Sequence, residues 1–188
     1  MAGLKEAKGY DNYVVNICPN NTEGEVITLG GLDIQIPKVP SKKEILFNGR
    51  ELHMQMWQRL PVPEELQRIR SMDEWYDMPS EFKKRFSTYI QEEFKRRREG
   101  IWFYNNGEPV YITGRHYMML QWSKMDIGYP SYLEFQRRLF IHFSACESDP
   151  RSVGQMYTKC RRSGYTNISA SILVDEGTQV KEKLLGIQ

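Results

Sequence analysis

Residues 159–166 bring together the side chain types that bind phosphate in many proteins. The stretch reads Lys159-Cys160-Arg161-Arg162-Ser163-Gly164-Tyr165-Thr166. A phosphate-binding loop needs converging backbone N–H groups, a cation, and a Ser or Thr hydroxyl that holds magnesium at the start of the next helix. Lys159 supplies the cation, Gly164 permits close approach of the backbone, and Thr166 stands in the magnesium position. These residues therefore predict a phosphate and magnesium site.

The loop departs from the usual spelling G-x-x-x-x-G-K-[ST]. Lys159 stands where the first glycine belongs, and Tyr165 stands where the lysine belongs. A lysine at the head of the loop can fold its long side chain over the same phosphates, so the charge requirement is met from the other end. Arg161 and Arg162 add guanidinium donors that suit phosphate oxygens. The alternative for this arginine pair is a surface that faces DNA or solvent.

A strand before the loop and a helix after it must position these side chains. Residues 153–158 predict the strand, and apolar residues that begin with Ile168 predict a final helix toward residue 185. The run 172–176 ends in Asp175-Glu176, as an acidic strand would. It starts only six positions after Thr166, however, and a strand there would remove the helix that binds phosphate. We therefore expect Asp175 and Glu176 to be solvated helix residues.

Upstream, two helices and a hairpin are predicted by local signals. A helix from Ser80, its expected cap, runs to a stop at Gly100, and its basic run 95–98 either faces the negative end of the helix dipole or contacts DNA. Residues 101–104 and 109–112 flank an Asn-Asn-Gly-Glu turn, which indicates a hairpin. Thr113 then caps a short helix in which His116 is expected to be a hydrogen-bonded structural histidine.

Ser131 and Glu134 have the spacing of a capping box, which opens a helix to about residue 147 with Phe135 in its apolar stripe. Before all of these elements, residues 1–60 carry weak strand signals among Pro and Gly and are expected to form an extended, loop-rich arm. The predicted division is an arm over 1–60, a subdomain of helices and hairpin over 61–130, and the start of a P-loop core over 131–188. The expected fold class is α/β, a truncated P-loop core (strand, P-loop, helix) preceded by a mixed helical and hairpin region.

Composition excludes several other classes of protein. Hydrophobic residues make up 40% and charged residues 27% of the 188, which is the profile of a folded globular chain. No apolar stretch is long enough for a membrane helix. The three cysteines and three histidines are scattered, so we expect reduced thiols and no His/Cys metal site. The net charge of +2 is too small to indicate nucleic-acid binding by itself.

The loop is similar to the variant Walker A motif of bacteriophage large terminase subunits. The positions that match are Lys159, Arg162, Gly164, Tyr165 and Thr166. The chain from about residue 40 onward also resembles the terminases of crAss-like and related phages. The stretches that carry this resemblance are Trp102-Phe103-Tyr104-Asn105-Asn106-Gly107, Tyr111-Ile112-Thr113-Gly114 with His116-Tyr117, Gly128-Tyr129-Pro130 and Arg137-Arg138.

The resemblance implies an ATPase that binds ATP and Mg²⁺. It implies catalytic roles for Lys159, Arg162 and Thr166, with Thr166 also the magnesium ligand. It implies nucleotide binding by Cys160, Arg161, Ser163, Gly164 and Tyr165, and by Gln136 with Phe135 on the adenine side. For Gln136 a solvated helix position is the alternative. In the family, the full-length protein joins this ATPase to an RNase-H-like nuclease and drives viral DNA into the procapsid.

The same resemblance sets expectations for partners and completeness. Double-stranded viral DNA, the portal protein and the small terminase subunit are the expected partners, in the host bacterial cytoplasm, with homo-oligomerisation possible and no membrane. The second acidic strand and the nuclease aspartates of the family do not occur before Gln188. We therefore expect this chain alone to bind nucleotide weakly and not to hydrolyse it. The alternatives are a protein- or DNA-docking module without nucleotide turnover and an unrelated basic α/β domain.

Overall fold

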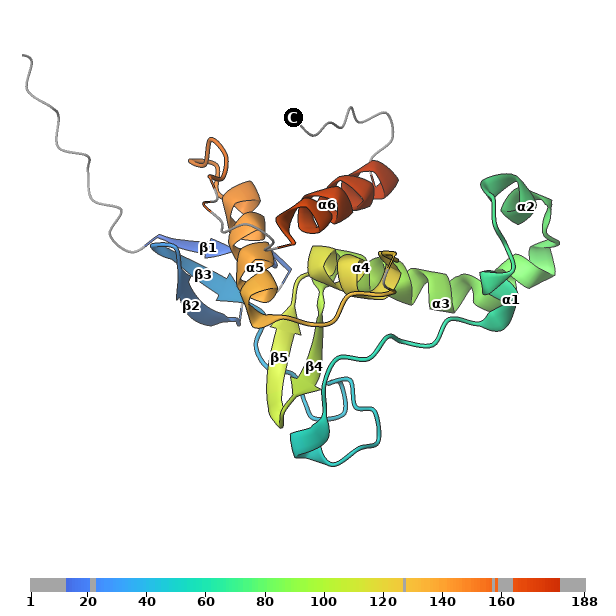
Figure 1. Cartoon of the computed structure of the whole chain (residues 1–188), viewed down its shortest axis with the longest axis horizontal. Coiled ribbons are helices and arrows are strands. Elements are labelled where there is room, and N and C mark those ends of the chain that lie inside the picture. Colours follow the sequence, from blue (N-terminus) through green and yellow to red (C-terminus); the bar gives the residue numbers. More distant parts are fainter. Residues whose placement is uncertain (1–12, 21–22, 127, 157, 159–163, 180–188) are drawn as a thin grey trace, which may run out of the picture.

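In the computed structural model of this protein, the described residues are 13–20, 23–126, 128–156, 158 and 164–179. Within them the chain forms six α-helices, one short 3₁₀ helix and two small β-sheets (Figure 1). The expected mixed α/β class is therefore confirmed. None of the helices in these ranges is long and apolar enough to cross a membrane.

A three-stranded sheet occupies the N-terminal part of the described chain. Its strands β1 (Val14–Asn16), β3 (Leu32–Ile36) and β2 (Glu25–Leu29) lie in that order, with β1 parallel and β2 antiparallel to β3. The β2–β3 turn uses Gly30 and Gly31 at φ 58° and 80°, which glycine adopts without strain. The described residues before about residue 36 therefore form a sheet and not the extended arm expected from the sequence. The sheet is completed by the pairing of β1 with β3, which follows β2 in the chain.

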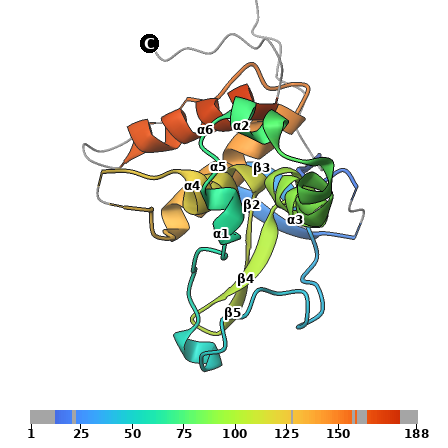
Figure 2. The same cartoon turned by 90° about the vertical axis from the view of Figure 1, so that its right-hand side faces the viewer.

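The predicted hairpin is confirmed as β4 (Ile101–Asn105) and β5 (Glu108–Ile112). Asn106 and Gly107 form the turn at φ 51° and 91°, as a two-residue turn with two left-handed positions requires. The hairpin extends away from the helices (Figure 2), and the 3₁₀ helix η1 (Leu52–Met54) lies beside its tip.

Three helices follow one another before the hairpin. They are α1 (Glu64–Gln67), α2 (Met72–Asp77) and the long α3 (Ser80–Glu99). The expected stop at Gly100 is confirmed at φ 76°. The expected cap at Ser80 is wrong by one position: Pro79 precedes the helix, and no side chain caps it. Proline suits this place because its missing N–H would have no helical partner.

The helix α4 (Gly114–Trp122) begins as predicted, with the Thr113 hydroxyl accepting from the N–H of His116 at 3.4 Å. Gly114 lies against the backbone of α3, because a Cβ at this position would be 1.9 Å from the carbonyl oxygen of Arg97. Only glycine allows the two helices to approach this closely.

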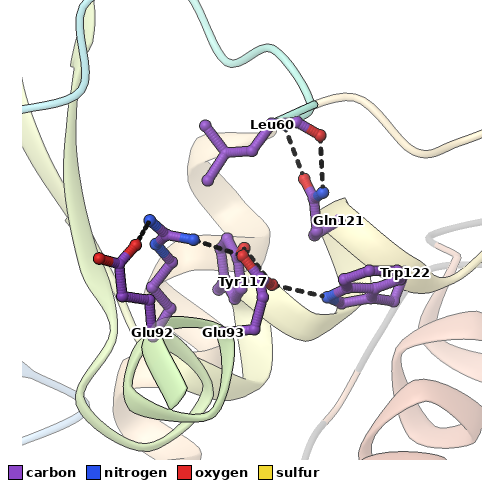
Figure 3. A network of polar contacts seen from close by, with 7 residues as sticks. Leu60, Glu92, Glu93, Tyr117, Gln121 and Trp122 are labelled. Atoms are coloured by element: carbon purple, nitrogen blue, oxygen red, sulfur yellow. Dashed lines mark hydrogen bonds and ion pairs between the residues drawn. The ribbon is translucent and has the colours of Figure 1, made fainter. Parts of the chain in front are cut away.

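A buried carboxylate also joins α3 to α4 (Figure 3). Glu93, 6% exposed, accepts hydrogen bonds from the Tyr117 hydroxyl at 2.7 and 2.9 Å and from the Trp122 indole at 3.2 Å. Arg96, one turn along α3, pairs with the same carboxylate. A buried charge needs such partners, so this cluster fixes the rotation of both helices.

The last two helices, α5 (Glu134–Ser148) and α6 (Tyr165–Gln179), pack together with α4. The predicted capping box is wrong: Leu133 is the N-cap residue, and no side chain caps the helix. Tyr132 packs against the ring of Phe103 at 5.1 Å and donates a hydrogen bond to Glu134. Because α5 starts only after Leu133, Ser131 lies too early to cap it. Tyr132 instead fixes this segment through its contact with Phe103 and its hydrogen bond to Glu134.

Candidate functional site

Five residues of the predicted phosphate loop lie outside the described residues. They are Lys159, Cys160, Arg161, Arg162 and Ser163. Their predicted roles stay predictions. The structure describes the end of the loop and the helix that follows it.

The helix α6 begins directly after the loop, as a phosphate-binding loop requires. Gly164 has φ 73°, and its carbonyl accepts from the N–H groups of Asn167 at 3.1 Å and Ile168 at 3.2 Å. A Cβ on Gly164 would meet no atom of a described residue within 4 Å, apart from its chain neighbours. Thr166 is exposed in the first turn, and that turn carries no acidic residue. Among the described residues, the first turn of α6 therefore carries no carboxylate of its own and leaves the Thr166 side chain exposed.

The predicted strand before the loop is not formed in its described part. Residues 153–156 have no strand conformation, and both Val153 and Met156 are almost fully exposed. A strand needs a neighbour for its N–H and C=O groups. Neither described sheet includes this segment: one is the β1–β3–β2 sheet and the other is the hairpin.

The two residues predicted on the adenine side differ in burial. Phe135 is 42% exposed, so its expected place in the apolar stripe of α5 is wrong, whereas Gln136 is 7% exposed. Solvation of Gln136, the alternative, is therefore also wrong. Its Oε1 is buried and accepts no hydrogen bond from a described residue. Gln136 lies one turn before Phe140, which belongs to the same core cluster as Tyr165 and Ile168 of α6.

Asp175 and Glu176 lie on α6, as predicted, but the expectation that they are solvated is wrong. Asp175 is fully buried and accepts two hydrogen bonds from Arg97, at 2.6 and 3.2 Å. Glu176 is 15% exposed and pairs with Arg115, which also pairs with Glu147 at 2.8 Å. These carboxylates hold α6 against the N-terminal end of α4 and the C-terminal end of α3.

The basic run 95–98 forms the last turn of α3, where cations favour the negative end of the helix dipole. Its members also have specific partners: Lys95 approaches Glu99 at 3.9 Å, and Arg97 is bound to Asp175. Arg98 is exposed and lines a cavity of about 230 Å³ with Arg97 and Arg115. The helix-end interpretation is thus supported by contacts, and the DNA-facing alternative stays untested.

His116 is structural, as predicted, but it is not hydrogen-bonded through its ring. The imidazole is fully buried between Phe140 at 4.8 Å and Tyr132 at 5.8 Å, stacked on both rings. Neither ring nitrogen has a hydrogen-bond partner among the described residues. Burial, with a smaller contribution from the positive charge of Arg137, lowers the pKa of His116 to about 3. The neutral ring therefore serves as a core aromatic.

The described residues contain no group of three His, Cys, Asp or Glu side chains that could hold a metal ion. Cys18 and Cys146 are free thiols, as expected, and burial raises the pKa of each. Cys160 lies outside the described residues.

Comparison with known proteins gives no relative. No protein-family model, no curated protein and no solved structure matches this chain.

Sequence reasoning did not identify the acidic residues that are buried in the core, Glu93 and Asp175, although their spacing from apolar residues indicates this burial. Glu93 follows Phe86 by seven positions on α3, and Asp175 follows Ile168 by seven on α6. Positions seven apart share a helix face, so both carboxylates lie on an apolar stripe. An acidic residue on such a stripe needs a buried partner, and each finds an arginine.

Proposed function

We propose that this chain contributes the nucleotide-binding segment of an ATPase of the phage large terminase type. The observation that carries the proposal is the start of α6. The helix begins directly after Gly164, whose φ lies in the left-handed region, and Thr166 is exposed in its first turn. Apart from the chain neighbours of Gly164, no described residue lies within 4 Å of a Cβ placed on it. The first N–H groups of a helix have no helical partner and attract anions.

The sequence of the loop complements this helix end. Residues 159–166 contain three cations, Lys159, Arg161 and Arg162, and no acid. We assign the β- and γ-phosphates of ATP to these cations together with the N–H groups at the start of α6. Thr166 offers the hydroxyl that would hold Mg²⁺, which neutralises phosphate charge when bound.

We assign the adenine to Gln136. Its buried Oε1 lacks a hydrogen-bond donor among the described residues, and such a group is unfavourable unless a ligand or water supplies the donor. The exocyclic amine of adenine is a donor of the required kind. Phe140, one turn after Gln136 on α5, and Tyr165 and Ile168 at the start of α6 belong to one core cluster, which supports a single site for base and phosphates.

In this proposal the chain acts in the host bacterial cytoplasm, within an assembly that moves double-stranded viral DNA through a portal. The small terminase subunit and further copies of the chain are the other proposed partners.

Titration of a fluorescent, non-hydrolysable ATP analogue into the 188-residue chain, with and without Mg²⁺, tests the proposal. We expect Lys159→Ala to weaken binding about tenfold or more, because a hydrogen bond to a charged group contributes about 1.5–3 kcal/mol. Thr166→Ala should abolish the enhancement by Mg²⁺. Lys38→Ala is the matched control, since Lys38 is 66% exposed and 3.7 Å from Glu23, and it should bind as the unmodified chain does.

Binding that is unchanged in both loop variants would contradict the proposal. The loop would then be structural, and a docking module without nucleotide turnover would be the better description.

A further inference from the structure

A large groove lies away from the proposed nucleotide site. It has a volume of about 1510 Å³ and runs between the segment 59–75 and the facing sides of α3 and α4. In Figure 1 this segment runs alongside α3, below it in the view, and α1 and α2 lie near the start of that helix. Ile90 and Phe94 of α3 and Met118 and Trp122 of α4 line the wall opposite the segment.

The groove exposes apolar side chains on both walls. Met72 is 63% exposed on one wall, and Phe94 is 49% exposed on the other. Trp75 also lines it, and its ring packs edge-on against Phe82 at 6.5 Å. Apolar side chains that gather in a concave surface, instead of lying singly, are typical of a docking site.

The wall formed by residues 60–63 cannot accept a peptide as an added strand. Both backbone groups of Leu60 are bound by the Gln121 side chain, at 2.9 Å each (Figure 3). Pro61 and Pro63 have no N–H group, and the carbonyl of Val62 accepts from Gln67 at 2.7 Å. Strand addition needs free backbone groups, so the occupant must be recognised by its side chains.

The charged side chains that line the groove without an ion pair to a described residue are two arginines and one acid, Glu64, which leaves an excess of one positive charge. The arginines are Arg59 and Arg70, and the Arg59 guanidinium stacks on Tyr129 at 3.3 Å. The other arginine at the groove, Arg97, is bound to Asp175. This excess therefore favours an occupant with acidic residues beside its apolar ones.

We propose that this groove binds an amphipathic α-helix of a partner protein, with an apolar stripe flanked by Asp or Glu. A helix is about 10–12 Å across and rises 1.5 Å per residue, so a groove of about 1510 Å³ has room for a short helix of two or three turns. Side-chain recognition by an apolar groove is the usual mode for such helices. This inference goes beyond the proposed nucleotide site and does not depend on it.

Fluorescence anisotropy with labelled probe peptides tests the inference on the 188-residue chain. The probe is a peptide of about fourteen residues with leucines on one helical face and glutamates on the other. One control peptide carries lysines in place of the glutamates, and a second has the same composition with the leucines spread around the helix. We expect the glutamate probe to bind at least about tenfold more tightly than either control.

Substitutions on both walls then locate the binding. Phe94→Glu and Met72→Glu should each weaken the glutamate probe about tenfold or more, since an apolar contact becomes a like charge. Phe47→Glu is the matched control, because Phe47 is 58% exposed outside the groove, and it should leave binding unchanged. Arg70→Glu should weaken the glutamate probe and not the lysine peptide. Circular dichroism checks that each variant is folded.

Several results would overturn the inference. Equal binding of the glutamate probe and either control peptide would remove the amphipathic or the acidic requirement. Equal binding by Phe94→Glu, Met72→Glu and the unmodified chain would place the probe elsewhere. If size-exclusion chromatography shows a dimer that Phe94→Glu and Met72→Glu convert to monomer, the occupant is a second copy of this chain.

Discussion

Arg97 on α3 donates two hydrogen bonds to one carboxylate oxygen of Asp175 on α6, from Nη2 at 2.6 Å and from Nε at 3.2 Å. Asp175 is fully buried, and the Arg97 side chain is 13% exposed. Arg97 also donates to the Thr178 hydroxyl at 2.5 Å. This pair connects the helix that follows the predicted phosphate loop to the end of the longest helix, so it sets where the start of α6 can lie.

We predict that Asp175→Ala lowers the free energy of unfolding by about 3 kcal/mol, because it leaves the Arg97 charge without its partner in a mostly buried place. Urea denaturation followed by tryptophan fluorescence measures the change. Glu23→Ala is the control, since Glu23 is 83% exposed in its pair with Lys38 and should contribute less than about 1 kcal/mol. Equal effects of the two substitutions would show that the buried pair does not fix α6.

We predict that Glu93→Gln destabilises the chain by about 2 kcal/mol. The amide loses the charge that faces Arg96 and places an NH₂ group among donors from Tyr117 and Trp122. Glu92→Gln is the matched control on the same helix, because Glu92 is 57% exposed and also pairs with Arg96, at 3.1 Å. Its effect should stay below about 1 kcal/mol by the same denaturation measurement.

Stability should depend on pH through His116. Its pKa falls from the ordinary value of 6.5 to about 3 on folding, because the ring is buried. Between these two values the unfolded chain binds a proton that the folded chain does not, so the free energy of unfolding decreases as the pH falls below 6.5. From pH 7.5 to pH 5 this group should remove about 2 kcal/mol of stability.

His116→Phe isolates that contribution, since a phenyl ring can keep the stacking with Tyr132 and Phe140 and cannot titrate. Denaturation of both proteins at pH 7.5 and pH 5 should show a loss smaller by about 2 kcal/mol in the variant. His53→Phe is the control, because His53 is 68% exposed, and its loss should match that of the unmodified chain. An identical loss in the His116 variant would mean that the buried ring accepts a proton.

Elements with local signals could be predicted from the sequence. Asn106 and Gly107 specify the hairpin turn, and Thr113 and Gly100 mark helix ends, because each acts on backbone within a few residues. Pairing over distance could not be predicted. The parallel register of β1 with β3 depends on a core that also takes residues from α5, far along the chain. The start of α5 is a second example. Ser131 is not its cap, because Tyr132 packs against Phe103 and the helix begins only after Leu133.

In the candidate site, too, features set by nearby residues could be predicted and features set by distant packing could not. The helix that follows Gly164 could be predicted from the loop and from the apolar residues beginning with Ile168, and it is present. The burial of Gln136 and Asp175 could not, because both are polar and their burial depends on which helices pack on α5 and α6. Residue types alone predict a strand over 153–158, but they do not specify the neighbouring strand that its backbone groups need.

Gly114→Ala should lower the free energy of unfolding by about 3 kcal/mol. The added Cβ would lie 1.9 Å from the Arg97 carbonyl oxygen and 2.4 Å from its carbon, so α3 and α4 must separate and the contacts of Glu93 with Tyr117 must loosen. Thermal and urea denaturation measure the loss. Gly177→Ala is the control: Gly177 is exposed within α6, where alanine stabilises a helix by up to about 1 kcal/mol. A Gly114 variant as stable as the unmodified chain would show that the two helices do not cross at this distance.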